Sequence, residues 1–75
     1  MIIVKQWEEE SYENDCLVKN CIVMMECHEK YIVANFRRAL GWCNNEIQTI
    51  GWEEFDGDID ADYHYRNMIA DIYNH

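Results

Sequence analysis

Residues 16–40 read CLVKNCIVMMECHEKYIVANFRRAL, and this stretch decides the fold because its first half has two structural interpretations. In residues 16–26, β-branched side chains such as Ile22 and Val23 favour a strand. The rival interpretation starts a helix near Asn20 and continues it through the two adjacent methionines, which are good helix formers. Hydrophobic periodicity does not separate a strand from a helix in so short an apolar run. The strand is favoured, and the helix stays open as the alternative.

The second half of the stretch, from His28 to Leu40, has the pattern of an amphipathic helix. The apolar residues fall on one stripe, and the basic residues fall on the opposite, solvated side. The stripe consists of Ile32, Phe36, Ala39 and Leu40, and the solvated side of Lys30, Arg37 and Arg38. Gly41 then stands where a left-handed residue is expected to end the helix. The sequence therefore predicts a helix over residues 28–40.

The flanking segments complete a predicted α+β domain. Residues 2–9 predict a strand and residues 10–15 a turn, so that residues 2–26 make a β-hairpin. Beyond residue 40, a short helix is expected from Asn44 to Gly51, and a longer amphipathic helix over residues 60–73. The predicted architecture is an N-terminal β-hairpin packed on about three helices. The alternative is a mostly α-helical bundle with one short N-terminal strand.

The charge balance restricts the classes of partner. Residues 1–75 form a single small acidic domain, with six Lys and Arg against fifteen Asp and Glu and a net charge of −9. Residues 1–15 carry −4 and residues 43–75 carry −7, whereas residues 16–42 carry +2. Direct binding to nucleic acid and to anionic membranes is disfavoured, because both require a basic surface. A domain this small also raises the prospect of a stabilising homodimer.

Neither a membrane segment nor an enzyme site is predicted. No run approaches the roughly 20 apolar residues of a membrane span, and MIIVKQWEEE lacks the basic region of a secretion signal. We therefore expect a cytoplasmic protein with reduced cysteines. The cysteine spacings lack paired zinc knuckles, and neither Cys27-His28 nor His64 has a predictable catalytic partner. No metal, cofactor or catalytic residue is expected.

The functional question concentrates on residues 52–62, WEEFDGDIDAD, where six carboxylates occur in eleven residues. The stretch fails as an EF-hand loop, because a loop starting at Asp56 has Ala61 where glycine is required and Asn67 where glutamate is required. Asp58 or Asp60 is a natural N-cap for the following helix. A cap does not explain the remaining carboxylates, which repel one another at a cost in stability.

We therefore interpret the surplus charge as a surface for a basic partner. In an extended chain, Asp56, Asp58 and Asp60 lie roughly 6.6 Å apart, and such a regular series of anions imitates the phosphates of a DNA strand. Aromatic side chains beside it would serve as interface anchors. The predicted partner-binding residues are Glu53, Glu54, Asp56, Asp58, Asp60 and Asp62 for charge, Trp52 and Phe55 as anchors, and Glu8, Glu9 and Glu10 as a second acidic group.

The acidic groups Glu8-Glu9-Glu10 and Glu53-Glu54, with the aspartates at 56, 58, 60 and 62, give the chain a resemblance to a class of small phage-encoded proteins. Those proteins disable host DNA-binding machinery, and they include DNA mimics among the anti-CRISPR proteins and inhibitors of nucleoid proteins. The resemblance implies a non-enzymatic inhibitor that occupies a basic, nucleic-acid-binding surface of a host protein in the host cytoplasm. The alternative is a small regulatory, antitoxin-like or homodimerising module that uses an aromatic and Met-rich surface.

Overall fold

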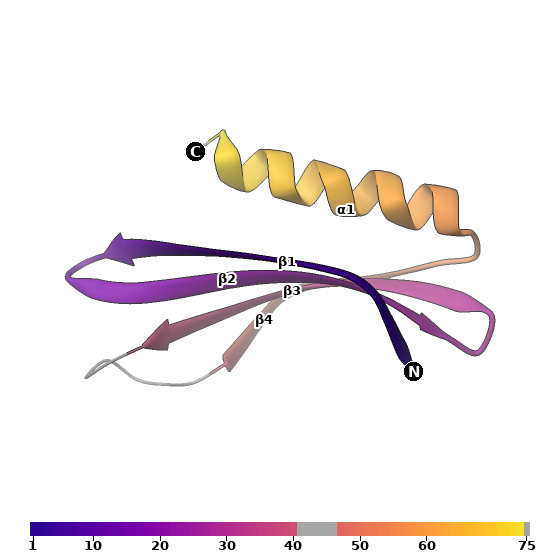
Figure 1. Ribbon diagram of the computed structural model, residues 1–75, viewed down its shortest axis with the longest axis horizontal. Helices are drawn as coiled ribbons and strands as arrows, with labels where there is room; N and C mark the ends of the chain where they lie inside the picture. The colour runs from indigo at the N-terminus through magenta and orange to yellow at the C-terminus, as the bar shows by residue number, and fades with distance from the viewer. Residues whose placement is uncertain (41–46, 75) are drawn as a thin grey trace.

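The chain folds into an antiparallel sheet followed by one helix (Figure 1). The structure, a computed structural model, describes residues 1–40 and 47–74. The elements in chain order are β1 (Ile2–Glu13), β2 (Cys16–Cys27), β3 (Lys30–Leu40), β4 (Ile47–Phe55) and α1 (Asp58–Tyr73). The strand order in the sheet is β1-β2-β3-β4, so each strand pairs with its neighbour in sequence.

Two tight turns connect the first three strands, and both place two consecutive residues at positive φ. Asn14 and Asp15 have φ of 51° and 64°, and His28 and Glu29 have φ of 49° and 66°. Two central residues at positive φ suit the right-handed twist of the flanking strands. Asn and Asp adopt this conformation readily, and the turn predicted over residues 10–15 lies there, although β1 extends to Glu13.

The predicted helix over residues 28–40 is wrong, because these residues form the turn at His28-Glu29 and the strand β3. β3 is an inner strand that buries side chains on both of its faces. Val33 is buried on one face and Ile32 and Ala34 on the other. An inner strand that carries apolar side chains on both faces loses the alternation of apolar and polar residues that identifies a strand.

The short helix expected from Asn44 to Gly51 is also wrong where the structure describes it. Ile47 to Ile50 belong to β4, and residues 44–46 lie outside the described residues. Gly51 is a strand residue opposite Asn35, beside an irregularity in the β3–β4 register. Both predicted architectures, the hairpin on three helices and the helical bundle, are therefore wrong. The described residues form four strands and one helix, with the expected hairpin as the first two strands.

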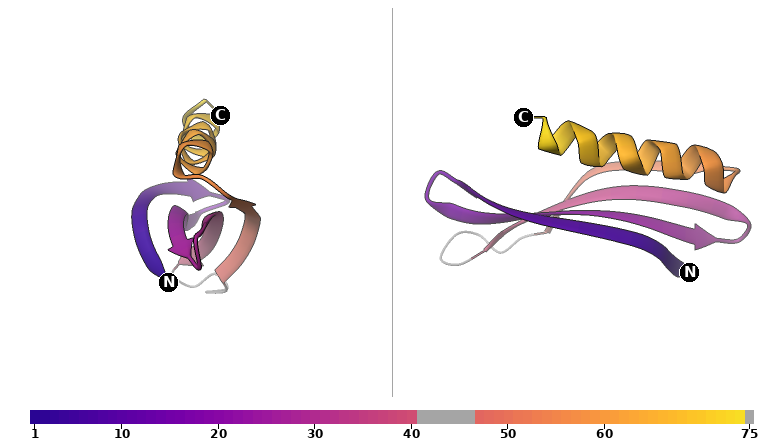
Figure 2. Two further views of the ribbon diagram at one scale, coloured as in Figure 1. Left: turned by 90° about the vertical axis from the view of Figure 1, so that its right-hand side faces the viewer. Right: turned by 45° about the horizontal axis from the view of Figure 1, so that its top comes forward.

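One face of the sheet packs against α1 and holds the main core (Figure 2). Ile22, Met24 and Val33 are at most 2 % exposed, and they contact Ala61 and Tyr65 from the helix. The ring of Trp7 on β1 meets the ring of Tyr73 edge-on, with the ring centroids 5.5 Å apart. α1 therefore lies over the inner strands and reaches the edge strand β1 at its far end.

The opposite face of the sheet carries a second apolar cluster, and we call it the open face. Val23, Met25, Ile32 and Ala34 form the cluster, and their neighbours Cys21, Cys27 and Phe36 shield it in part. Among residues 1–40 and 47–74, no helix or further strand lies on this face. The buried methionines Met24 and Met25 lie in the two separate clusters, so they do not form an exposed Met-rich surface.

The cysteines only partly match the expected reduced state. Cys16 is disulfide-bonded, which contradicts that expectation, whereas Cys21 and Cys27 are free and half-buried. Burial raises the pKa of the Cys21 thiol, and the negative charge of Glu8 raises it further. Both effects keep this thiol protonated at neutral pH.

Candidate partner-binding surface

The acidic stretch 52–62 spans a strand, a connection and the start of a helix. Glu53 and Glu54 lie in β4, Asp56 lies in the connection, and α1 begins at Asp58. A helix turns each residue by about 100° about its axis, so Asp58, Asp60 and Asp62 do not form the extended series that their spacing predicts. Glu53 and Glu54 are adjacent in a strand, and they therefore point to opposite faces of the sheet.

The start of α1 is acidic, as expected, but its N-cap residue is not one of the predicted aspartates. The N-cap is Gly57, with φ −123° and ψ 152° and no side-chain capping bond, so neither Asp58 nor Asp60 is the cap. Both lie in the first turn of α1. Carboxylates in the first turn interact favourably with the positive end of the helix dipole.

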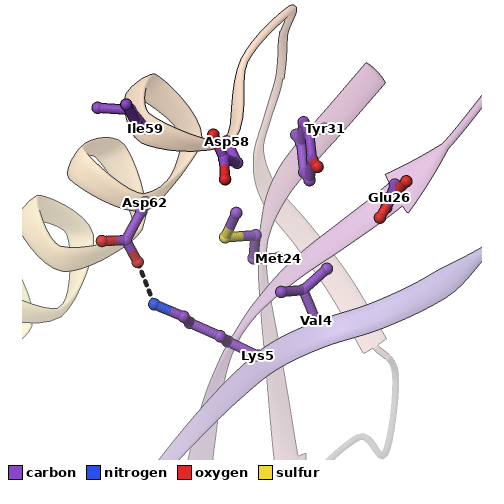
Figure 3. Close-up of a pocket in the computed structure, with 8 residues that line it drawn as sticks. All are labelled: Val4, Lys5, Met24, Glu26, Tyr31, Asp58, Ile59 and Asp62. Carbon is purple, nitrogen blue, oxygen red and sulfur yellow. Dashed lines mark hydrogen bonds and ion pairs between the residues drawn. The ribbon is translucent and has the colours of Figure 1, made fainter. Parts of the chain in front are cut away.

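Asp62 is turned toward the sheet and ion-paired twice. Its carboxylate accepts a hydrogen bond from the Nζ of Lys5 on β1 (Figure 3), and its other oxygen lies 2.9 Å from Nε of Arg66, one turn along the helix. The hydrogen bond from Lys5 lowers the pKa of Asp62, and the positive charge of Arg66 lowers it further. Asp62 therefore joins α1 to β1, and its charge is neutralised by two cations of the same chain.

An open pocket of about 350 Å³ lies beside this ion pair, between β1, the inner strands and the first turns of α1 (Figure 3). Its lining combines acidic, apolar and aromatic side chains, namely Val4, Lys5, Met24, Glu26, Tyr31, Asp58, Ile59 and Asp62. The negative charge of Glu26 raises the pKa of Tyr31, and burial and Asp58 raise it further. The Tyr31 hydroxyl therefore stays protonated between two carboxylates.

The two predicted aromatic anchors differ in accessibility. Phe55 is half-buried, packs against the core under α1, and lies with its ring centroid 5.1 Å from that of His64. Trp52 is 51 % exposed and lies opposite Ala34, on the open face. Only Trp52 has the exposure that an interface anchor needs.

Several of the predicted acids have partners within the chain. Glu53 Oε2 lies 3.7 Å from Nε2 of His64 on the helix side, and Asp56 Oδ1 lies 3.8 Å from Nζ of Lys30. The Lys30–Asp56 pair is largely exposed and contributes little to stability. The Nε2 atom of His64 is buried without a hydrogen bond to a described residue, and it forms an ion pair with Glu53 only when the imidazole is protonated. Asp58 and Asp60 remain as acids of the stretch that lie on α1, are exposed, and form no ion pair with a described residue.

The second predicted group, Glu8 to Glu10, is divided between the two faces of the sheet. Glu8 and Glu10 share the open face with Cys21 and Lys19, and Glu8 Oε2 lies 3.1 Å from Nζ of Lys19. Glu9 points to the helix side, opposite Asn20, and is half-buried. The three consecutive glutamates therefore do not present one patch.

The strand register assigns charged side chains to each side of the sheet, because residues paired across strands share a face. The open face has Glu8, Glu10, Glu54 and Asp56 against Lys19, Lys30 and Arg38, a net charge of −1. The helix side has Glu9, Glu13, Glu26, Glu53, Asp58, Asp60, Asp62 and Asp71 against Lys5, Arg37 and Arg66, a net charge of −5. Most of the described net charge thus lies on the helix side, which we call the acidic surface.

The sequence interpretation did not identify three acids of this surface, one of which is Glu13 on β1. Glu26 lies on β2, beside Tyr31 of β3, and Asp71 lies near the end of α1. Neither stands in a run of acids, so their contribution becomes visible only once the strand register and the helix are known. Arg37 on β3 is also part of this side, where it is ion-paired with Glu13.

Within residues 1–40 and 47–74, no group of three or more His, Cys, Asp or Glu side chains is arranged to hold a metal ion. No helix in the same part of the chain has both the length and the apolar composition needed to cross a membrane. Comparisons with protein-family models, with curated proteins and with solved structures find no match to this chain.

Proposed function

We propose that the protein is a non-enzymatic inhibitor that mimics DNA and occupies the basic, nucleic-acid-binding surface of a host protein, as phage-encoded inhibitors do. One observation supports the proposal: the net charge is distributed unevenly, with −5 on the acidic surface and −1 on the open face. On the acidic surface, five carboxylates have no ion pair with any described residue. They are Glu9, Glu26, Asp58, Asp60 and Asp71.

The proposed binding surface does not consist of the extended series of aspartates that the sequence predicts. The carboxylates stand on a sheet and a helix, which hold them at fixed positions before a partner arrives. Fixed charges of one sign attract a protein of the opposite sign over several ångströms and accelerate its association. The self-repulsion of these charges costs stability, and a partner that supplies Lys and Arg relieves that cost.

Asp62 contributes little to this proposed surface, because Lys5 and Arg66 already neutralise it. Asp58 and Asp60 are the strongest candidates, because both are exposed at the start of α1. Glu10 lies on the open face and is left out of the proposed binding surface.

The test compares two doubly substituted variants in affinity capture from a bacterial lysate. Asp58→Asn/Asp60→Asn removes two charges from the acidic surface, and Glu10→Gln/Asp15→Asn removes the same charge elsewhere. We expect the wild type to retain a DNA-binding protein at low salt, to release it at high salt, and to release it to added duplex DNA. The Asp58/Asp60 variant should retain several-fold less, and the matched control should behave as the wild type.

Retention that is indifferent to salt, to duplex DNA and to the loss of Asp58 and Asp60 would contradict the proposal. The alternative of a regulatory or antitoxin-like module on an aromatic and Met-rich surface gains no specific support, because the large exposed aromatics are dispersed. Tyr12 and Trp52 lie on the open face, on different edge strands, whereas Tyr63 and Tyr73 lie on α1.

The proposal also includes a cytoplasmic site of action, and the state of Cys16 provides its test. Disulfides are rare in the reducing cytoplasm of most organisms. The disulfide bond of Cys16 therefore counts against this part of the proposal, and rapid alkylation of intact cells followed by mass spectrometry tests it, because reduction of that bond in cells would support a cytoplasmic site. Recovery of Cys16 in its disulfide-bonded form would indicate an oxidising compartment instead.

A further inference from the structure

We infer that the open face is the interface of a homodimer, in which two copies of this chain pack face to face about a two-fold axis that crosses the strands. The inference is independent of the proposed function, because it uses the face of the sheet opposite the acidic surface. Four observations carry it: the apolar character of the face, the excess exposed area of the whole chain, the small net charge of the face, and the absence of ion pairs at three of its charged side chains.

The apolar character continues from the centre of the open face to its rim. The side chains of the central cluster, Val23, Met25, Ile32 and Ala34, are buried, but three large side chains around them are exposed. Ile3, opposite Met25, is 58 % exposed; Trp52, opposite Ala34, is 51 % exposed; and Ile47, opposite Arg38, is 64 % exposed. Exposed apolar side chains around an apolar centre are typical of a surface that another protein covers.

The chain exposes more surface than a monomeric protein of its mass usually does, as expected if a second sheet packs against it. A monomeric protein of 9.1 kDa exposes about 4,900 Å² by the usual scaling of surface with mass, whereas this chain exposes 5432 Å². The excess of roughly 500 Å² is a large fraction of the roughly 800 Å² that each partner buries in a standard interface. Pairing two such sheets about 10 Å apart gives a sandwich with an apolar interior.

The charge balance identifies a second copy of this chain as the occupant. Two molecules with a net charge of −9 repel each other through most of their surfaces. The open face carries only −1 of that charge, and it has both signs at its rim. A basic partner gains little from such a face, whereas an identical copy meets it with little net repulsion and with charges of both signs available for pairing.

Three charged side chains of the open face form no ion pair with a described residue. Of the six Lys and Arg side chains, Arg38 is the one without such a pair, and Glu10 and Glu54 have none either. Arg38 lies in the cross-strand row Glu10–Lys19–Arg38–Ile47 near one end of the sheet. Glu54 lies in the row Ile3–Met25–Ile32–Glu54 near the other end.

A two-fold axis across the strands exchanges these two ends. An axis that crosses β3 at Asn35 places Arg38 of one copy over Ile32 of the other, and Glu54 is the neighbour of Ile32 in the adjacent strand. Adjacent strands are about 4.8 Å apart, a distance that the long Arg38 side chain spans. The same axis produces the contact twice, because a two-fold interface is self-complementary. The geometry thus pairs Arg38 with Glu54 across the dimer.

The experiment measures the monomer–dimer equilibrium by analytical ultracentrifugation for the wild type, Arg38→Glu, Glu54→Arg and the double variant that exchanges both charges. We expect a concentration-dependent dimer for the wild type. Each single reversal should weaken dimerisation by about tenfold or more, because it places like charges together. The double exchange keeps the net charge and should restore dimerisation to near the wild-type value.

Asp71→Arg serves as the matched control, because it changes the net charge as Glu54→Arg does but lies on α1. It should not weaken dimerisation. Trp52→Ser tests the apolar rim without any change of charge, and it should weaken dimerisation as well. Circular dichroism of each variant confirms that the monomer is folded.

A wild type that stays monomeric up to millimolar concentration overturns the inference. So does a dimer that neither Arg38→Glu nor Trp52→Ser weakens, or a double exchange that dimerises no better than the single variants. None of these outcomes bears on the affinity capture through Asp58 and Asp60, so the two proposals fail separately.

Discussion

Asp62 shows how one residue of an acidic stretch acquires a role unlike that of its neighbours. The sequence groups it with Asp56, Asp58 and Asp60 as one of a regular series of anions. The structure instead turns it toward Lys5 on β1, while Arg66 approaches from within the helix. Two cations from different elements meet at this carboxylate, and no spacing rule in the sequence indicates that meeting. Its charge stabilises the contact between α1 and the edge of the sheet.

This arrangement predicts a stability contribution from Asp62 that depends on pH. The pKa of Asp62 is lowered from its ordinary value of 3.8 in the folded protein, so the carboxylate stabilises the fold above that value. The contribution is lost as the pH falls below 3.8 and through the lowered folded-state pKa. Asp62→Asn should therefore reduce the melting temperature at neutral pH by a few degrees, and the difference from wild type should shrink at about pH 2.

Thermal unfolding, monitored by circular dichroism, measures the melting temperature of each protein at neutral pH and at about pH 2. Asp71→Asn is the control, because Asp71 is an exposed acid of the same helix without an ion pair among the described residues. It lies near the negative end of the helix dipole, so its removal should be neutral or slightly stabilising. An Asp62→Asn variant as stable as wild type at neutral pH would show that the ion pairs are energetically unimportant.

At the scale of elements, the sequence predicts best where local chemistry alone determines the structure. The turn at Asn14-Asp15 and the strands on either side are anticipated, because Asn and Asp favour positive φ between β-branched runs. The second turn, His28-Glu29, has a histidine, which adopts positive φ more readily than most residues, but also a glutamate, which seldom does, and the sequence therefore does not predict it. Once that turn is missed, the apolar residues of β3 fit a helical stripe as well as a strand.

The candidate surface was predictable in its charge but not in its layout. The acidic character of residues 52–62 is evident from composition, whereas the division of Glu53 and Glu54 between two faces requires the register of β4 against β3. The start of α1 at Asp58 also depends on tertiary packing, because Ala61 and Tyr65 must face the sheet. Long-range pairing of this kind leaves no signal in a local window of sequence.

The start of α1 also offers a stabilising substitution. Gly57 has the extended backbone of an N-cap but supplies no side-chain acceptor to the free N–H groups of the first turn. Gly57→Ser adds that acceptor, and a Cβ there meets nothing within 4 Å. We expect the free energy of unfolding to rise by roughly a few tenths of a kcal/mol.

Urea unfolding of the wild type, Gly57→Ser and Gly57→Ala measures the effect. The alanine variant reduces backbone freedom as serine does but provides no capping oxygen, so the difference between the two variants isolates the cap. If alanine stabilises the protein as much as serine, the gain comes from backbone entropy and not from capping.

At the scale of the whole molecule, the net charge of −9 opposes folding. All carboxylates of the folded chain are held within a small volume, and only a few cations neutralise them. Added salt screens this repulsion, while the exposed ion pairs lose little because they contribute little at low salt. The melting temperature at neutral pH should therefore rise with sodium chloride concentration.

A series of melting curves from low to about 1 M salt tests this expectation, since the screening length shortens from about 30 Å at 0.01 M to about 3 Å at 1 M. A melting temperature that falls with salt would mean that the ion pairs of Lys5, Lys19 and Arg37 outweigh the repulsion. Repeating the series with potassium chloride separates general screening from binding of a particular ion.

The strand order β1-β2-β3-β4 has a consequence for the way the chain acquires its structure during synthesis. Each strand pairs with the one just made, so the sheet can grow hairpin by hairpin without waiting for distant segments. The apolar face formed by Ile22, Met24 and Val33 nevertheless stays bare until α1 has been translated. The contacts Lys5–Asp62 and Trp7–Tyr73 then join the beginning of the sheet to the helix. Completion of the fold therefore coincides with the closing of its longest loop.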